Sequence, residues 1–145
     1  MYLPAGAGGG VMLASHHRIT REGWAHRQDN CDVLMSQLVL DEAAAGDSAA
    51  ARDRILALAD FPLLDLTGEV GIVAKALVNS LALPAKATTD AAHIALAAVH
   101  GMHFLLTWNC THIANAEMAV AIAGCCREHG LVAPVICTPE ELMGR

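Results

Sequence analysis

The stretch TTDAAHIALAAVHGMHFLLTWN, residues Thr88–Asn109, decides the fold. Its first half is rich in alanine, which favours a helix that Thr88 or Thr89 would cap, and Gly101 supplies a natural helix end. HFLLTW, which follows, is an unbroken apolar run with the length of a buried strand. The stretch therefore predicts a buried helix and a buried strand, with the polar residues Asp90 and Asn109 at its two ends.

Strands alternate with helices along the rest of the chain. The other predicted strands are CDVLMS (31–36), PLLDLT (62–67) and PVICT (134–138). The other predicted helices are one or two within 12–28, one from the N-cap Ser36 to Gly46, one begun by Asp47 or Ser48, one opened by Thr67 and ending near 81–84, and one over 112–130. Because several strands are continuous apolar runs, the pattern predicts a parallel sheet covered on both faces by helices. The expected fold is α/β, a three-layer α/β/α sandwich in a single domain of 145 residues.

The composition limits the classes of function. The chain is 54% hydrophobic with a mean hydropathy of +0.41, but much of this is alanine and no apolar run is long enough for a bilayer. No leader pattern is visible at the N-terminus, so we expect a cytoplasmic protein whose five cysteines are reduced and mostly buried. The formal net charge of −6 argues against passive binding of nucleic acid, because phosphate contacts need lysine and arginine. An RNA ligand would need a bound divalent cation or a basic rim.

Three oxygen-bearing side chains lie at element ends that a parallel sheet brings together. Asn109 follows the strand HFLLTW, Glu42 lies in the helix after CDVLMS, and Asp90 lies in the first turn of the helix before HFLLTW. Such hard oxygen ligands suit Mg²⁺ or Mn²⁺, which need only one or two protein carboxylates. Taken singly, Asp90 also fits a helix cap, Glu42 a solvated face beside Asp41, and Asn109 a turn.

The segments SQLVLDEAAAGD (36–47), TTDAAHIALAAVHGMHFLLTWNCTHIANA (88–116) and VICTPEELMG (135–144) resemble the PIN-domain family, in particular its VapC-type toxin branch. The resemblance extends from about Thr20 to the C-terminus. It implies an α/β/α sandwich, a Mg²⁺- or Mn²⁺-dependent endoribonuclease of toxin–antitoxin type, and a small antitoxin protein as partner. Glu42 and Asp90 match acidic positions of the family, and Asn109 takes the place of a later aspartate. The resemblance implies Asp90 as the main metal ligand, Glu42 as ligand or water-orienting group, and Asn109 as a positioning group, with the Thr107 hydroxyl nearby.

The N-terminal region departs from the family pattern. Family members begin with a strand that ends in an acidic residue, as in YLDTS, whereas this chain reads MYLPAGAGGG with Pro4 after Leu3. Proline cannot ligate a metal, and residues 1–19 are atypical as a whole. Two functions are therefore expected as alternatives: a ribonuclease impaired by the missing carboxylate, or an inactive PIN-fold binding module that pairs with an antitoxin-like protein.

Other patterns in the sequence suggest different sites. Gly6, Gly8 and Gly9 suggest a phosphate loop, but Val11 stands where its third glycine is needed. A zinc site would draw on residues without the usual paired spacing, namely Cys110, His112, Cys125, Cys126, His129 and Cys137. His93, one turn after Asp90, fits either a partner of the site or a core histidine, and His112 fits a helix cap. The apolar, alanine-rich composition also predicts a homodimer.

Overall fold

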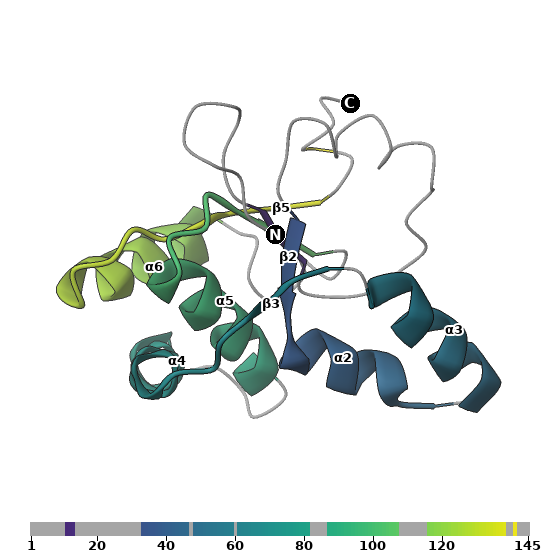
Figure 1. The fold of residues 1–145 in the computed structure, drawn as a ribbon. Helices are drawn as coiled ribbons and strands as arrows, with labels where there is room; N and C mark the ends of the chain where they lie inside the picture. The colour runs from purple at the N-terminus through teal and green to yellow at the C-terminus, as the bar shows by residue number, and fades with distance from the viewer. Residues whose placement is uncertain are drawn as a thin grey trace.

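The computed structural model describes residues 11–13, 33–46, 48–59, 61–81, 87–107, 116–138 and 141. Five short strands form one sheet: β1 (Val11–Leu13), β2 (Val33–Ser36), β3 (Leu63–Leu64), β4 (Phe104–Leu106) and β5 (Val135–Cys137). The helices are α2 (Gln37–Ala44), α3 (Ser48–Leu58), α4 (Gly68–Leu81), α5 (Thr88–Val99) and α6 (Ala116–Glu128), as Figure 1 shows. The predicted strands all appear, as β2 to β5, and every recorded pairing is parallel. The α/β class with a parallel sheet is thus confirmed.

The order of the strands in the sheet is β3-β2-β1-β4-β5, so β1 is the middle strand. The chain moves outward from β1 through β2 to β3, then crosses to β4 and β5 on the other side of β1. In open parallel sheets, ligands bind outside the carboxyl ends of the strands, where the strand order reverses. Here that place is next to the carboxyl ends of β1 and β4.

The middle strand corrects the prediction for the N-terminal region. The sequence predicted a helix from residue 12 onward, but Met12 and Leu13 belong to β1. This three-residue strand is held by pairing on both sides, with Met12 opposite Leu34 of β2 and Leu105 of β4. The rest of the predicted helix, 14–28, lies outside the described residues. The glycine-rich stretch precedes β1 in the chain, whereas a phosphate loop follows a strand and opens a helix. The glycines themselves lie outside the described residues, and the element that directly follows them is a strand and not a helix.

The turn between α5 and β4 explains how the stretch that decides the fold reverses direction. Gly101 has a φ of 71°, and its N–H donates to the carbonyl of Ala98 at 3.1 Å. The N–H of Met102 donates to the carbonyl of Ala97 at 2.8 Å. These two bonds and the left-handed glycine form a Schellman motif, which satisfies the last carbonyls of the helix. The helix end predicted at Gly101 is confirmed.

The helix starts agree less well with prediction. Ser36 precedes α2 in an extended conformation, but its side chain makes no capping hydrogen bond. α5 likewise has no side-chain cap bond at its N-cap, and Thr88 is already helical, so the capping role predicted for Thr88 or Thr89 is wrong. At α4 the prediction is confirmed, because Thr67 Oγ1 accepts a hydrogen bond from the N–H of Val70 at 3.4 Å.

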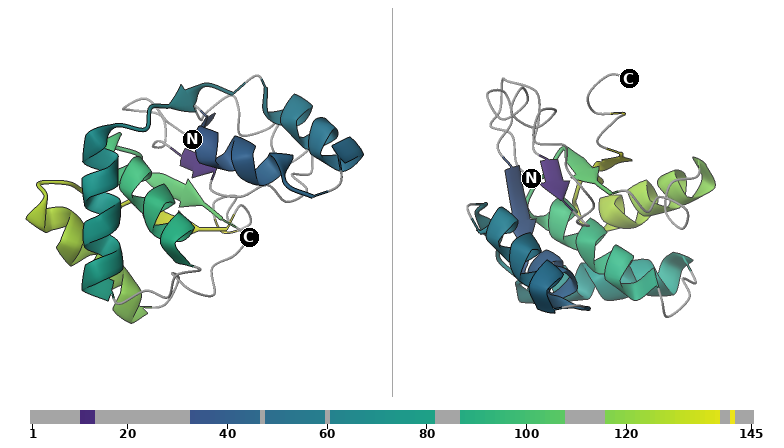
Figure 2. Two further views of the ribbon diagram at one scale, coloured as in Figure 1. Left: turned by 90° about the horizontal axis from the view of Figure 1, so that it is seen from below. Right: turned by 90° about the vertical axis from the view of Figure 1, so that its right-hand side faces the viewer.

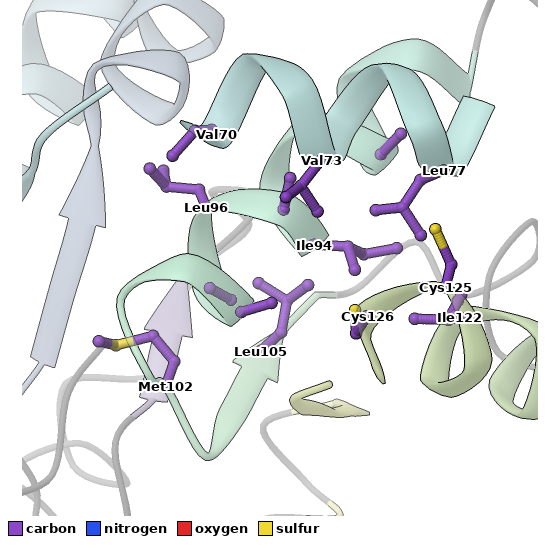
Figure 3. Close-up of a cluster of buried hydrophobic side chains, with 14 residues drawn as sticks. Val70, Val73, Leu77, Ile94, Leu96, Met102, Leu105, Ile122, Cys125 and Cys126 are labelled. Atoms are coloured by element: carbon purple, nitrogen blue, oxygen red, sulfur yellow. The ribbon is translucent and has the colours of Figure 1, made fainter. Parts of the chain in front are cut away.

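The core lies where α4, α5 and α6 meet β4, as Figure 3 shows. α4 packs along α5 and also contacts α6, while α5 packs on β4. α2 and α3 form a separate helix pair to one side of this group, as Figures 1 and 2 show. The largest completely buried side chains are those of Met35, Leu77, Ile94, Leu96, Leu105 and Leu106. Four of these six belong to the stretch 88–109, whose burial was predicted. Across the described residues, no helix has the length and apolar character that crossing a membrane requires.

Candidate functional site

Glu42 and Asp90, two of the predicted site residues, lie on elements that meet at one edge of the sheet. α2 begins directly after Ser36, the last residue of β2, so its start stands at the carboxyl end of that strand. α5 turns tightly into β4 at Gly101 and therefore runs back along the sheet. Its first turn, which contains Asp90, lies toward the carboxyl edge, and Figure 1 shows this end of α5 beside the start of α2.

Glu42 of α2 and His93 of α5 are in direct contact, although they are 51 positions apart in the sequence. His93 Nε2 lies 3.1 Å from Glu42 Oε1. Because an ionised carboxylate only accepts, Nε2 carries the hydrogen of this bond. The His93 side chain is 2% exposed and that of Glu42 is 40% exposed, so a buried ring holds a carboxylate that solvent reaches.

Two buried polar atoms at this edge have no hydrogen-bond partner within the described part of the chain. They are Oγ of Ser36, at the end of β2, and Nδ1 of His93. A buried polar group without a partner costs roughly 1–3 kcal/mol, so native structures hold few of them. Such groups concentrate where a protein gives up stability for a functional arrangement. Both unpartnered atoms belong to the elements that contribute the predicted site.

Glu42 differs in its surroundings from its neighbour Asp41. Asp41 Oδ1 accepts a hydrogen bond from Gln37 Nε2 at 3.0 Å, an exposed pair within one helix. Asp41 thus belongs to the solvated face of α2, as the alternative interpretation of this acidic pair proposed. Glu42 instead bridges to another helix. The interpretation of Glu42 as a merely solvated side chain is therefore wrong.

The remaining predicted residues are placed less completely. Asp90 is half-buried in the first turn of α5, and Thr107 is buried directly after β4. Thr107 extends the pairing of β4 with β5, because its N–H donates to the carbonyl of Cys137 at 3.0 Å. Asn109 and Pro4 lie outside the described residues.

The oxygen donors at this edge match Mg²⁺ or Mn²⁺ in kind. Carboxylates are the ligands these cations prefer, and Mg²⁺ usually retains several waters and takes one or two carboxylates from the protein. Within the described residues, no three His, Cys, Asp or Glu side chains converge as a metal-binding group. Glu42, His93 and Asp90 are thus not a complete ligand set. The described part supplies two carboxylates on adjoining elements, which fits an ion held largely by water.

The cysteines of the described residues are structural. Cys125, Cys126 and Cys137 are buried and form no disulfide within the described residues, as predicted for reduced thiols. Burial, with a smaller contribution from Cys125, raises the pKa of the Cys126 thiol to about 11. A buried thiol with a raised pKa is unreactive as a nucleophile near neutral pH. Since Cys110 and His112 lie outside the described residues, the zinc alternative has no support in the part that is described.

Sequence reasoning named Glu42 and Asp90 but left His93 open between a partner of the site and a core residue. The signal was its spacing of one turn from Asp90, which cannot reveal a partner on a distant helix. Compared with models of known protein families, with curated proteins and with solved structures, the chain matches none of them. The PIN-domain resemblance accordingly stays a prediction.

Proposed function

We propose that this chain is a metal-dependent endoribonuclease of the PIN-domain, VapC-type toxin family. The observation that supports it most is the contact between Glu42 and the buried His93 ring. It joins the acidic residue of α2 to the helix that carries Asp90, at the carboxyl edge of a parallel sheet. The three-layer α/β/α sandwich and the single PIN-like domain belong to the same proposal.

The proposed chemistry is hydrolysis of an RNA phosphodiester. Asp90 and Glu42 would hold Mg²⁺ or Mn²⁺, with Asn109 as a further oxygen ligand, and the bound ion would supply charge stabilisation and an acidified water. The exposed carboxylate of Glu42 is suited to orient an attacking water and to take its proton, while the P–O bond to the leaving oxygen breaks and that oxygen takes a proton from solvent. The Thr107 hydroxyl and the Asn109 amide would position the phosphate.

The net charge of the chain supports a cation as part of the site. At a formal charge of −6 the protein repels an RNA backbone, so bulk electrostatics do not bring the substrate in. A divalent cation between two carboxylates reverses the local sign where cleavage would occur. The same acidic edge would accept a basic side chain of an antitoxin protein.

Within this proposal, the missing carboxylate belongs after β1 and not at Pro4. The family resemblance implies an acidic residue at the end of the first strand, which the sequence placed at Pro4. The first described strand is β1, which ends at Leu13, and the next residues in the chain are Ala14 and Ser15. Ala14 therefore takes the position of the missing acid in this proposal.

The absence of a carboxylate at Ala14 favours a second candidate, a PIN-fold binding module without nuclease activity. Such a protein would keep Glu42 and Asp90 for pairing with a basic antitoxin side chain and would lack cleavage. The exposed side chains of Ile72, Val120 and Val132 also keep the predicted homodimer as part of the proposal, which sedimentation of the full chain tests.

Cleavage of a structured RNA by the full chain with Mn²⁺ tests the proposed function. We expect cleavage that EDTA and Asp90→Ala abolish, and a higher rate for Ala14→Asp. Pro4→Asp adds the same charge before β1 and should leave the rate unchanged. No cleavage by the wild type that Ala14→Asp restores would support the fold and an impaired site. No cleavage by either protein would refute the nuclease proposal and favour the binding module.

A further inference from the structure

Burying a histidine at position 93 of α5 lowers the stability of the protein. His93 is 2% exposed, and Ala91, Ile94 and Ala95 around it in the helix are completely buried. A core histidine that served packing alone would satisfy both of its nitrogens. Within the described residues, however, Nδ1 has no hydrogen-bond partner. An apolar side chain would avoid this cost, so packing does not explain the choice of histidine.

The other ring nitrogen of His93, Nε2, makes the contact that shows what the histidine provides. Its Nε2–H donates to Oε1 of Glu42 at 3.1 Å, while the second carboxylate oxygen of Glu42 is not part of that contact. The ring is fixed by the packing around α5, whereas Glu42 is exposed and has several rotatable bonds. A hydrogen bond from a fixed donor restricts such a carboxylate to few rotamers. It leaves Oε2 in one defined direction.

The bond also connects two parts of the fold that pack separately. α2 packs mainly with α3, whereas α5 packs with α4 and β4. Without the His93 bond, the Glu42 carboxylate could move relative to Asp90, which is carried on α5. Since outer hydrogen bonds orient the groups that bind a metal, the relative position of the two carboxylates depends on this contact.

We infer that His93 is a positioning residue, which holds the Glu42 carboxylate in place for a divalent cation through its Nε2–H. This inference rests on the proposed function. His93 acts through Glu42 in this inference, because its Nε2 contacts that carboxylate and its Nδ1 is buried. Loss of such orienting bonds typically weakens metal binding about 10- to 100-fold.

Mn²⁺ binding to the full chain, measured by titration calorimetry, tests the inference with two matched amide variants. His93→Gln places an N–H near the position of Nε2, whereas the shorter side chain of His93→Asn does not reach it. We expect His93→Asn to weaken Mn²⁺ binding about 10- to 100-fold and His93→Gln to retain most of the affinity. In a Glu42→Ala background, His93→Asn should cause no further loss. Thermal unfolding without metal measures any structural effect separately.

The possible results distinguish the inference from the proposed function. Equal losses for His93→Gln and His93→Asn, or an unchanged loss in the Glu42→Ala background, would overturn the positioning role while metal binding stands. A wild type that does not bind Mn²⁺ would overturn the proposed function together with the inference. If the buried short amide prevents folding, His93→Leu, which leaves no polar atom to satisfy, repeats the measurement with the same expected loss.

Discussion

Leu105→Ala should destabilise the protein strongly, because Leu105 is the point where the sheet and the helices share one core. It is completely buried, and it pairs with Met12 of β1 on one side and Ile136 of β5 on the other. It also belongs to the apolar cluster that α4, α5 and α6 form. Truncation of a buried leucine costs about 2–5 kcal/mol, through lost burial and the remaining cavity. We take about 3 kcal/mol as the expected loss of unfolding free energy.

This loss converts into a shift of the melting temperature. Unfolding entropy of about 2.1 cal/mol/K per residue gives roughly 0.3 kcal/mol/K for this chain of 145 residues. A loss of about 3 kcal/mol then lowers Tm by about 10 °C in thermal unfolding followed by circular dichroism. The matched control is Leu56→Ala, whose side chain is 66% exposed and which should change stability by less than about 0.5 kcal/mol. Equal shifts for both variants would refute the placement of the core.

Three further predictions concern single residues. Gly101→Ala forces a side chain into a φ of 71° and should lower the unfolding free energy, measured by denaturant titration, by about 1 kcal/mol. Gly71→Ala in α4 has equally open space around it and should instead stabilise the helix in the same titration. Burial raises the pKa of Cys126 from 9.0 to about 11, so the thiol loses its proton at a lower pH in the unfolded chain than in the folded one. The stability of the folded protein should therefore fall as pH rises from about 9 to 11. Tm measured across this window should fall less in Cys126→Ala, which lacks the thiol. Glu42→Ala leaves the buried imidazole of His93 without its acceptor and should lower the unfolding free energy by roughly 1–3 kcal/mol, which a lower Tm would show. Asp41→Ala, on the exposed face of the same helix, should leave Tm almost unchanged.

The parts of the fold that sequence reasoning predicted are those fixed by local signals. The unit of α5 and β4 was predicted because alanine and leucine favour the helix, Gly101 ends it, and the strand is an apolar run. β1 was missed because Val11–Leu13 is short and lies between a glycine-rich and a polar stretch. Its strand conformation depends on β2 and β4, which pair with it from distant parts of the chain. No local pattern contains that information.

The candidate site also has some features that local signals in the sequence predict and others that depend on distant parts of the chain. The positions of Glu42 and Asp90 near the ends of predicted elements follow from the alternation of strands and helices. The contact of Glu42 with His93 does not, because it depends on how α2 turns after Ser36 and on the angle at which α5 passes it. Pro4 and Ala14 both lie outside the described residues, so the position of the acid that the family resemblance implies stays a prediction. Without β1, the end of the first strand could not be located in the sequence.

The position of β1 explains why the residue after it should matter more than the other acidic positions. β1 is the only strand that pairs with both β2 and β4 in the described sheet, so β2 and β4 do not touch each other. Glu42 follows β2, and Asn109 comes shortly after β4 in the sequence. In the proposed site, a carboxylate directly after β1 would add a third acidic group, but the next residue in the sequence is Ala14. In the described chain, α5 carries Asp90 in its first turn and donates the bond from His93 to Glu42. We therefore expect the His93 bond to contribute more to metal binding in this chain than it would after Ala14→Asp.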